Sequence, residues 1–182
     1  MADISRLQCK ETVYGTPQHV LKAVREYFGG PIPLDPCTTK DNPTDAVRFF
    51  TKEQDGILQD WDSCYVNPPW GKELRPFIEK IAFEASKGTE ILFLCSISNR
   101  FETAYWHASV LTQYQNAEVI FDKRVQFEKP IYGEDGAVVK WEKTKSNNLS
   151  SIMFGFNVDV LRFVNAFRVL GCPRVVNNFV VQ

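Results

Sequence analysis

The hydrophobic residues of the chain recur at helical spacing in some segments and in short continuous runs in others, which predicts an α/β protein. The first helix is predicted over residues 18–28, because its apolar residues recur at helical spacing before Gly29-Gly30. Thr16 is a good N-cap for this helix, and Pro17 is a good first-turn residue. The same pattern predicts further helices over residues 74–87, 101–113 and 158–170.

Short apolar runs between these helices predict β-strands. Residues 90–95 are almost continuously apolar, as expected of a parallel strand that is covered on both faces. With the strand-like run 63–66 and the helix between them, they indicate a βαβ unit. The other strands are expected over residues 31–34, 117–121, 125–127, 138–141, 151–156 and 174–181.

A polar insertion around residues 128–149 separates the later strands. Gly133-Glu134-Asp135-Gly136 within it predicts the tip of a hairpin. The insertion ends in a cluster of cations and amides, which makes it a candidate substrate-recognition loop: Lys140, Lys143, Lys145, Asn147 and Asn148.

Length and composition narrow the class of protein. A chain of 182 residues with 44% hydrophobic content can bury one good core, so we expect residues 1–182 to form a single domain. The formal net charge of -1 excludes the overall basic character of a strong nucleic-acid binder. Any contact with nucleic acid must therefore come from a local patch.

The five cysteines show no C-x-x-C spacing, and the chain has only two histidines, so we expect neither a metal site nor a disulfide framework. Reduced cysteines are typical of cytoplasmic proteins. No apolar run approaches the roughly 18 residues that span a bilayer, and the N-terminus lacks the apolar core of a signal peptide. These features predict a cytoplasmic protein.

The most specific chemical motif is Asn67-Pro68-Pro69-Trp70, which directly follows the predicted strand 63–66. The side-chain oxygen of Asn67 and the carbonyl oxygen of Pro68 can both accept hydrogen bonds from one exocyclic amino group. Such bonds draw the nitrogen lone pair out of conjugation, so that it can attack an electrophilic methyl group. The prolines hold the two acceptors rigidly, and Trp70 offers a face for a base taken out of its stack.

The tetrapeptide is also compatible with an ordinary turn, since Asn-Pro and Pro-Pro are common in loops. A chance match to Asn/Asp/Ser-Pro-Pro-aromatic in a chain of this length has odds of roughly 1 in 100. We therefore favour a site for methyl transfer to an amine.

Several motifs together resemble the phage-type, Dam-like family of DNA adenine N6-methyltransferases. Asn67-Pro68-Pro69-Trp70-Gly71 is similar to the family's catalytic loop, in which Tyr is commoner than Trp in fourth place. The other similar segments are Tyr14-Gly15-Thr16-Pro17, which has an extra glycine, Leu34-Asp35-Pro36-Cys37, Asp55-Gly56-Ile57 with Trp61, Arg100-Phe101-Glu102-Thr103 with Trp106-His107, and Arg124-Val125-Gln126-Phe127. Ser98 and Lys123 depart from the family pattern, which has Pro and Gly there.

The resemblance implies a Rossmann-like S-adenosylmethionine-dependent methyltransferase fold. Its central sheet would be mostly parallel, with helices on both faces and antiparallel strands toward the C-terminus. It also implies S-adenosylmethionine as the methyl donor and adenine in DNA as the acceptor. The target adenine would be flipped from the duplex, stacked on Trp70 and bound through its amino group by Asn67 and Pro68, without a metal.

Candidate residues for the donor lie at strand ends and at the first helix. Asp35 follows a strand and could hold the donor's ammonium group, or it could cap a helix. Asp55 could bind the donor's adenine or ribose, or it could belong to an Asp-Gly turn. The remaining donor contacts follow from the resemblance: Tyr14, Thr16, Pro17, Pro36 and Cys37.

Four cations could contact DNA phosphates: Lys72, Arg75, Arg100 and Arg124. The polar insertion is small for a recognition domain. We therefore expect a short recognition site, relaxed specificity, or a homodimer in which a second subunit helps to hold the DNA.

Other functions remain open at this point. The motif is compatible with methylation of cytosine N4, of adenine in RNA or of a protein glutamine. A non-catalytic DNA-binding subunit could also keep the fold as a scaffold, although a scaffold does not need the tetrapeptide. The resemblance to phage enzymes would place the protein in a host cytoplasm, with a role in anti-restriction or in regulation.

Overall fold

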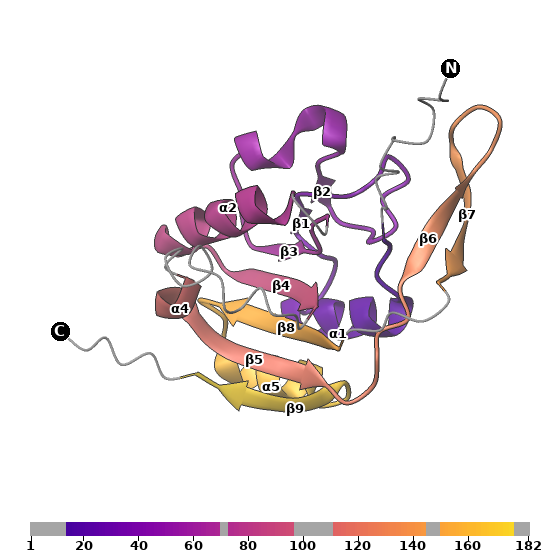
Figure 1. Cartoon of the computed structure of the whole chain (residues 1–182). Helices are drawn as coiled ribbons and strands as arrows, with labels where there is room; N and C mark the ends of the chain where they lie inside the picture. Colours follow the sequence, from indigo (N-terminus) through magenta and orange to yellow (C-terminus); the bar gives the residue numbers. More distant parts are fainter. Residues whose placement is uncertain (1–13, 70–72, 97–110, 145–149, 177–182) are drawn as a thin grey trace, which may run out of the picture.

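The computed structural model describes residues 14–69, 73–96, 111–144 and 150–176 (Figure 1). Helices and strands together form a three-layered α/β body from which one β-hairpin projects. Most elements follow the hydrophobic pattern, and the structure differs from the prediction in how the strands are paired and in the bounds of several elements.

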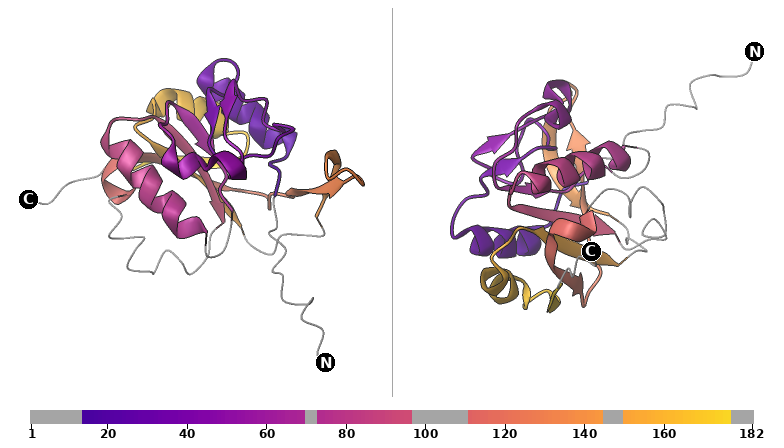
Figure 2. Two further views of the ribbon diagram at one scale, coloured as in Figure 1. Left: turned by 90° about the horizontal axis from the view of Figure 1, so that it is seen from above. Right: turned by 90° about the vertical axis from the view of Figure 1, so that its left-hand side faces the viewer.

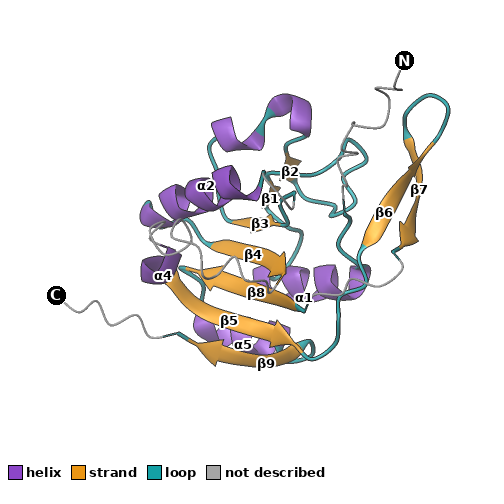
Figure 3. Cartoon of the chain, in the orientation of Figure 1, coloured by secondary structure: helices purple, strands orange, loops and turns teal. Residues whose placement is uncertain are grey.

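The central sheet has five strands in the order β3-β4-β8-β5-β9 (Figure 3). Their bounds are β3 Cys64–Val66, β4 Ile91–Ser96, β8 Ser151–Phe156, β5 Gln115–Phe121 and β9 Gly171–Val175. β3 and β4 are parallel, whereas the pairs β4–β8, β8–β5 and β5–β9 are antiparallel.

The expectation of a mostly parallel sheet is therefore wrong, because the sheet is mixed. A parallel neighbour requires a crossover that returns the chain to its starting edge. The helix α2 (Leu74–Ser86) provides this crossover between β3 and β4, which confirms the predicted βαβ unit. Between β5 and β8 the described chain contains a hairpin instead of a crossover helix, and β8 runs back antiparallel to β5.

Helices cover both faces of the sheet (Figure 2). α2 packs on one face, over Ile91 and Phe93 of β4. α1 (Gln18–Phe28) and α5 (Val160–Phe167) pack on the other, over Leu92 and Leu94 of the same strand. The continuous apolar run is therefore buried on both faces, as predicted.

The start of α1 differs from the prediction. Pro17, and not Thr16, is the N-cap residue, and no side chain caps the helix. The helix ends at the predicted glycine, Gly29, whose φ of 70° is in the left-handed region. The hydroxyl of Thr16 is thus available for other partners, which are described below.

Two small sheets flank the body. β1 (Leu34–Asp35) pairs in parallel with β2 (Arg48–Phe49) and lies beside β3. β6 (Glu128–Tyr132) and β7 (Val138–Lys143) form the projecting antiparallel hairpin. Its tip is the predicted one, since the amide of Gly133 donates to the carbonyl of Ala137 at 2.8 Å.

Several predicted elements have other bounds. The strand predicted over residues 31–34 is β1, Leu34–Asp35, and the helix predicted over residues 158–170 is α5, Val160–Phe167. Residues 125–127 form no strand; Val125 and Phe127 are buried all the same, because they pack into the core as β5 leads to β6. The last strand begins at Gly171 and ends at Val175, and the end of its predicted range lies outside the described residues. Of the predicted helix 101–113, the structure describes only the part within α4 (Leu111–Tyr114).

In the described part of the chain, no helix has both the length and the hydrophobicity to cross a membrane.

Candidate functional site

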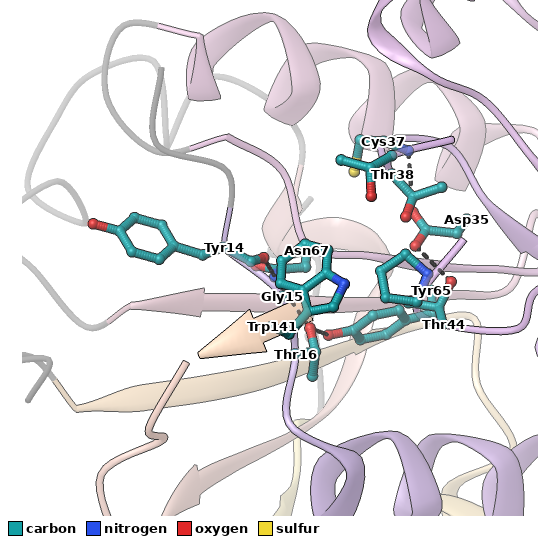
Figure 4. Close-up of a pocket in the computed structure, with 12 residues that line it drawn as sticks. Tyr14, Gly15, Thr16, Asp35, Cys37, Thr38, Thr44, Tyr65, Asn67 and Trp141 are labelled. Carbon is teal, nitrogen blue, oxygen red and sulfur yellow. Dashed lines mark hydrogen bonds between the residues drawn. The ribbon is translucent and has the colours of Figure 1, made fainter. Parts of the chain in front are cut away.

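A pocket opens where β1 and β3 end, beside the base of the β6–β7 hairpin (Figure 4). Parallel strands of α/β proteins commonly bind ligands at their carboxyl ends. Five predicted site residues line this pocket together with seven others: Tyr14, Thr16, Asp35, Cys37 and Asn67, with Gly15, Thr38, Thr39, Pro43, Thr44, Tyr65 and Trp141.

Asp35, the last residue of β1, places a carboxylate in the pocket with only 3% of its surface exposed. One oxygen accepts the amide of Cys37 at 3.1 Å and the other accepts the hydroxyl of Thr44 at 2.9 Å. No cation among the described residues pairs with it. Burial raises the pKa of Asp35 to about 6, although the hydrogen bonds from Cys37 and Thr44 oppose this rise.

Asn67 follows β3 directly and reaches the pocket from the opposite wall (Figure 4). Its amide nitrogen donates to the carbonyl of Tyr14 and to the hydroxyl oxygen of Thr16, both at 3.1 Å. Because the carbonyl of Tyr14 can only accept, the nitrogen must face it and the oxygen must point elsewhere. That oxygen, Oδ1, is buried and has no hydrogen-bond partner among the described residues.

An unpartnered buried acceptor is costly, at about 1–3 kcal/mol, and is therefore uncommon in proteins. Because Asn67 lines the pocket, this oxygen is a candidate acceptor for a hydrogen bond from a ligand. Pro68 is buried and Pro69 is half-buried directly after Asn67, and Trp70 lies outside the described residues.

Thr16 links the side chain of Asn67 to that of Tyr65 in β3. Its hydroxyl lies 2.7 Å from the hydroxyl of Tyr65, which is fully buried in β3. Thr16 therefore positions the amide of Asn67 and does not cap α1. Pro17 serves as the N-cap of α1 and is not among the residues that line the pocket.

Cys37 contributes a neutral thiol to the pocket wall. Burial raises its pKa well above the ordinary value, and the nearby Asp35 carboxylate raises it further, whereas a backbone hydrogen bond with Asn67 opposes the rise. Among the described cysteines none forms a disulfide.

Asp55 does not line the pocket. Its carboxylate accepts the amide of Ile57 at 3.2 Å and caps the short 3-10 helix η3 (Gly56–Leu58). Gly56 packs so closely that a Cβ there would lie 1.9 Å from the carbonyl oxygen of Pro36. The indole nitrogen of Trp61 donates to the carbonyl of Gly56 at 2.7 Å. Residues 55–61 therefore pack against Pro36, next to Asp35, and do not line the pocket.

Of the four candidate phosphate-binding cations, the two that the structure describes do not line the pocket. Arg75 lies on the surface of α2, where it pairs with Glu79 at 2.8 Å. Arg124 is exposed in the loop after β5. Lys72 and Arg100 lie outside the described residues.

Seven residues that line the pocket were not predicted as site residues: Gly15, Thr38, Thr39, Pro43, Thr44, Tyr65 and Trp141. Trp141 left a usable signal, because a tryptophan within an otherwise polar insertion has no obvious core to enter. Tyr65 looked like an ordinary strand residue, and Thr44 lies in an irregular loop. Within the described ranges, no cluster of three or more His, Cys, Asp or Glu side chains could hold a metal ion.

The fold and the pocket define an α/β protein in which a buried carboxylate and the side-chain amide of Asn67 line one pocket at the ends of β1 and β3. A family model described as DNA N-6-adenine-methyltransferase (Dam) matches residues 6–162. The chain therefore belongs to this family of DNA adenine methyltransferases, which confirms the resemblance found in the sequence. A comparison with curated proteins found no match.

Proposed function

We propose that the protein transfers a methyl group from S-adenosylmethionine to the exocyclic N6 amine of adenine in DNA, on a Rossmann-like fold. The single observation that carries this proposal is the buried, unpartnered Oδ1 of Asn67 in a pocket shared with Asp35. The Dam family membership supports adenine in DNA as the acceptor in preference to cytosine, RNA or a protein glutamine.

The pocket residues fit the donor. S-adenosylmethionine carries an ammonium group, and Asp35 offers a buried carboxylate without a cation beside it. A cation at this position would compensate the cost of keeping the carboxylate charged in the interior. The buried carboxylate of Asp35 thus matches the ammonium group of S-adenosylmethionine. Cys37, Thr38 and Thr44 would complete the pocket wall around the amino-acid end of the ligand.

Asn67 and Pro68 would act on the amine of the target base. When bound, S-adenosylmethionine supplies an electrophilic methyl group on a sulfonium. Asn67 Oδ1 and the carbonyl of Pro68 would accept the two amino hydrogens and so localise the nitrogen lone pair for attack. The hydrogen bonds from Asn67 to Tyr14 and Thr16 fix the amide before the substrate arrives, so that little reorganisation remains.

The residues that we propose for DNA binding lie partly within and partly outside the residues that the structure describes. We propose that the target adenine is flipped and stacks on Trp70, while Lys72, Arg75, Arg100 and Arg124 contact phosphates. The recognition site would be short or relaxed, since the hairpin is small, or a homodimer would extend the contact. Because DNA is the acceptor, we expect the enzyme to act in the cytoplasm, that of the host if a phage encodes it.

The test is to incubate the protein with tritiated S-adenosylmethionine and matched DNA and RNA duplexes, and then to digest the products to nucleosides. We expect the label in N6-methyladenine from DNA. Label in N4-methylcytosine, label confined to RNA, or binding of DNA with no transfer at all would each contradict the proposal.

A further inference from the structure

Trp141 belongs to the projecting hairpin, yet its indole ring forms part of the same pocket as Asn67 and Thr16 (Figure 4). The backbone holds it there. The amide of Gly15 donates to the carbonyl of Glu128 at 2.7 Å, and the amide of Glu128 donates back at 3.0 Å. This bridge fixes the base of β6 to the segment before α1.

The glycine at position 15 allows the ring to come close. A Cβ on residue 15 would lie 2.7 Å from Cε3 and 2.8 Å from Cζ3 of Trp141. Real Cβ atoms do not approach so closely, so a larger residue would displace the indole. The extra glycine in the Tyr14-Gly15-Thr16-Pro17 segment therefore has a physical role in seating Trp141.

Asp41 holds the other side of the indole. Its carboxylate accepts a hydrogen bond from Nε1 of Trp141 at 2.8 Å, across the gap between the loop after β1 and the hairpin. A hydrogen bond from an indole N–H to a carboxylate polarises the ring and makes its face more electron-rich. An electron-rich indole face attracts cations.

The charge of the residues that line the pocket also favours a cationic ligand. Among the described residues that line it there is no Lys, Arg or His, and Asp35 is the one carboxylate. Burial keeps the pKa of the Cys37 thiol and of the Tyr65 hydroxyl well above their ordinary values, so both stay neutral. At neutral pH the pocket is therefore negative and favours a cationic ligand.

We infer that Trp141, polarised by Asp41, is a specificity-determining residue that selects S-adenosylmethionine over its product, S-adenosylhomocysteine, which lacks the positive charge of the sulfonium. The inference rests on the proposed function, because the methyl group must lie beside the amine that Asn67 holds. Trp141 lines the pocket with Asn67, so its ring is in a position to meet the sulfonium. Release of the product would be favoured by the same contact.

Isothermal titration calorimetry of the whole chain with both ligands tests this inference. In Trp141→Leu, we expect the preference for S-adenosylmethionine over S-adenosylhomocysteine to fall by roughly three- to thirty-fold, with little change in product affinity. Trp141→Phe keeps an aromatic face and should lose less. The analogue with an amine-bearing carbon in place of the sulfonium should behave like the donor, which separates charge from methyl packing.

Two variants that each remove one negative charge from the loop after β1 test the role of Asp41. Asp41→Asn keeps an acceptor oxygen but loses the charge, and should lower the preference for the donor. Asp45→Asn, whose exposed carboxylate pairs with Arg25 at 3.5 Å and does not line the pocket, should leave it unchanged.

An equal loss of both ligands in the Trp141 variants, or an unchanged preference in Trp141→Phe and Asp41→Asn, would overturn the inference and leave the proposed function standing. Failure of the unmodified protein to bind either ligand would contradict the proposed function, and the inference with it. Thermal melting of each variant identifies those that fold, and Trp141→Phe and Asp41→Asn provide the test if Trp141→Leu does not.

Discussion

Asp35 is kept charged in the interior at a cost to the stability of the protein without its ligand. Only 3% of the surface of Asp35 is exposed to solvent. Hydrogen bonds from Cys37 and Thr44 replace only part of the hydration that the carboxylate has lost. Its pKa is consequently raised from 3.8 to about 6. Active sites commonly hold groups in such unfavourable environments.

Replacing Asp35 by Asn should therefore stabilise the unliganded protein while it weakens donor binding. A raised pKa means that the stability contributed by the protonated acid is present below pH 3.8 and is lost as the pH rises through about 6. At pH 7.5 we expect a gain of roughly 1–3 kcal/mol in the free energy of unfolding, shrinking toward pH 4. Donor affinity should fall by about 30-fold or more.

Urea unfolding at the two pH values and calorimetry with S-adenosylmethionine measure the two effects. Asp62→Asn, on an exposed carboxylate that pairs with Arg48 at 3.0 Å, is the matched control and should change both quantities little. Destabilisation of Asp35→Asn at pH 7.5, or unchanged donor binding, would show that Asp35 has a different role.

Single residues were predictable where their chemistry depended on neighbours in sequence. Asp35 is the last residue of β1 and Asn67 directly follows β3, and the structure brings both to one pocket. The role of Asp55 could not be predicted in this way. An Asp-Gly pair has the same sequence whether its carboxylate binds a ligand or caps a helix, and in the structure Asp55 caps η3. A tryptophan in a mainly polar insertion marked Trp141 as unusual, but its place in the pocket could not be predicted, because that place depends on the distant Gly15–Glu128 bridge.

At the scale of elements, the hairpin is seated through Gly15 and Trp141. Gly15→Ala should force the indole to move and cost about 1–3 kcal/mol of stability, as overpacking usually does. The cost should largely disappear in a Trp141→Leu background, because the clash is then removed. A double-mutant cycle from urea unfolding measures this coupling.

Gly30→Ala is the control for the cycle, since no atom lies within 4 Å of a Cβ at that position. It should show no coupling to Trp141→Leu. Equal costs of Gly15→Ala in both backgrounds would mean that the glycine is needed for its backbone alone.

Most elements were predictable because their apolar period is clear. The helix 18–28 and the strand 151–156 have the predicted bounds. Strand pairing was not predictable in the same way, because the apolar pattern of β8 is equally suited to a parallel or an antiparallel neighbour. The segment 125–127 shows a further ambiguity, since buried apolar residues in an irregular connection resemble a strand.

At the scale of the whole molecule, the balanced charge limits how the protein can hold DNA. The formal net charge is -1, so binding would depend on a few local cations. If the four candidate cations each neutralise one phosphate, the logarithm of the affinity should fall with the logarithm of salt concentration with a slope of about -4 or shallower.

Arg124→Ala should make this slope shallower by about 1, because one phosphate contact is lost. Arg168→Ala removes another exposed cation, at the end of α5, and should leave the slope unchanged. Fluorescence anisotropy with a labelled duplex at several salt concentrations provides the slopes, and an equal effect of both variants would exclude a specific contact by Arg124.

The proposed reaction depends above all on the side-chain oxygen of Asn67, and methyl transfer to DNA by Asn67→Ala measures that dependence. We expect transfer to fall by about 100-fold or more. Calorimetry should find donor affinity within about threefold of the unmodified protein, because Asp35 and Trp141 remain in place. Undiminished methyl transfer by a folded Asn67→Ala variant would contradict the account.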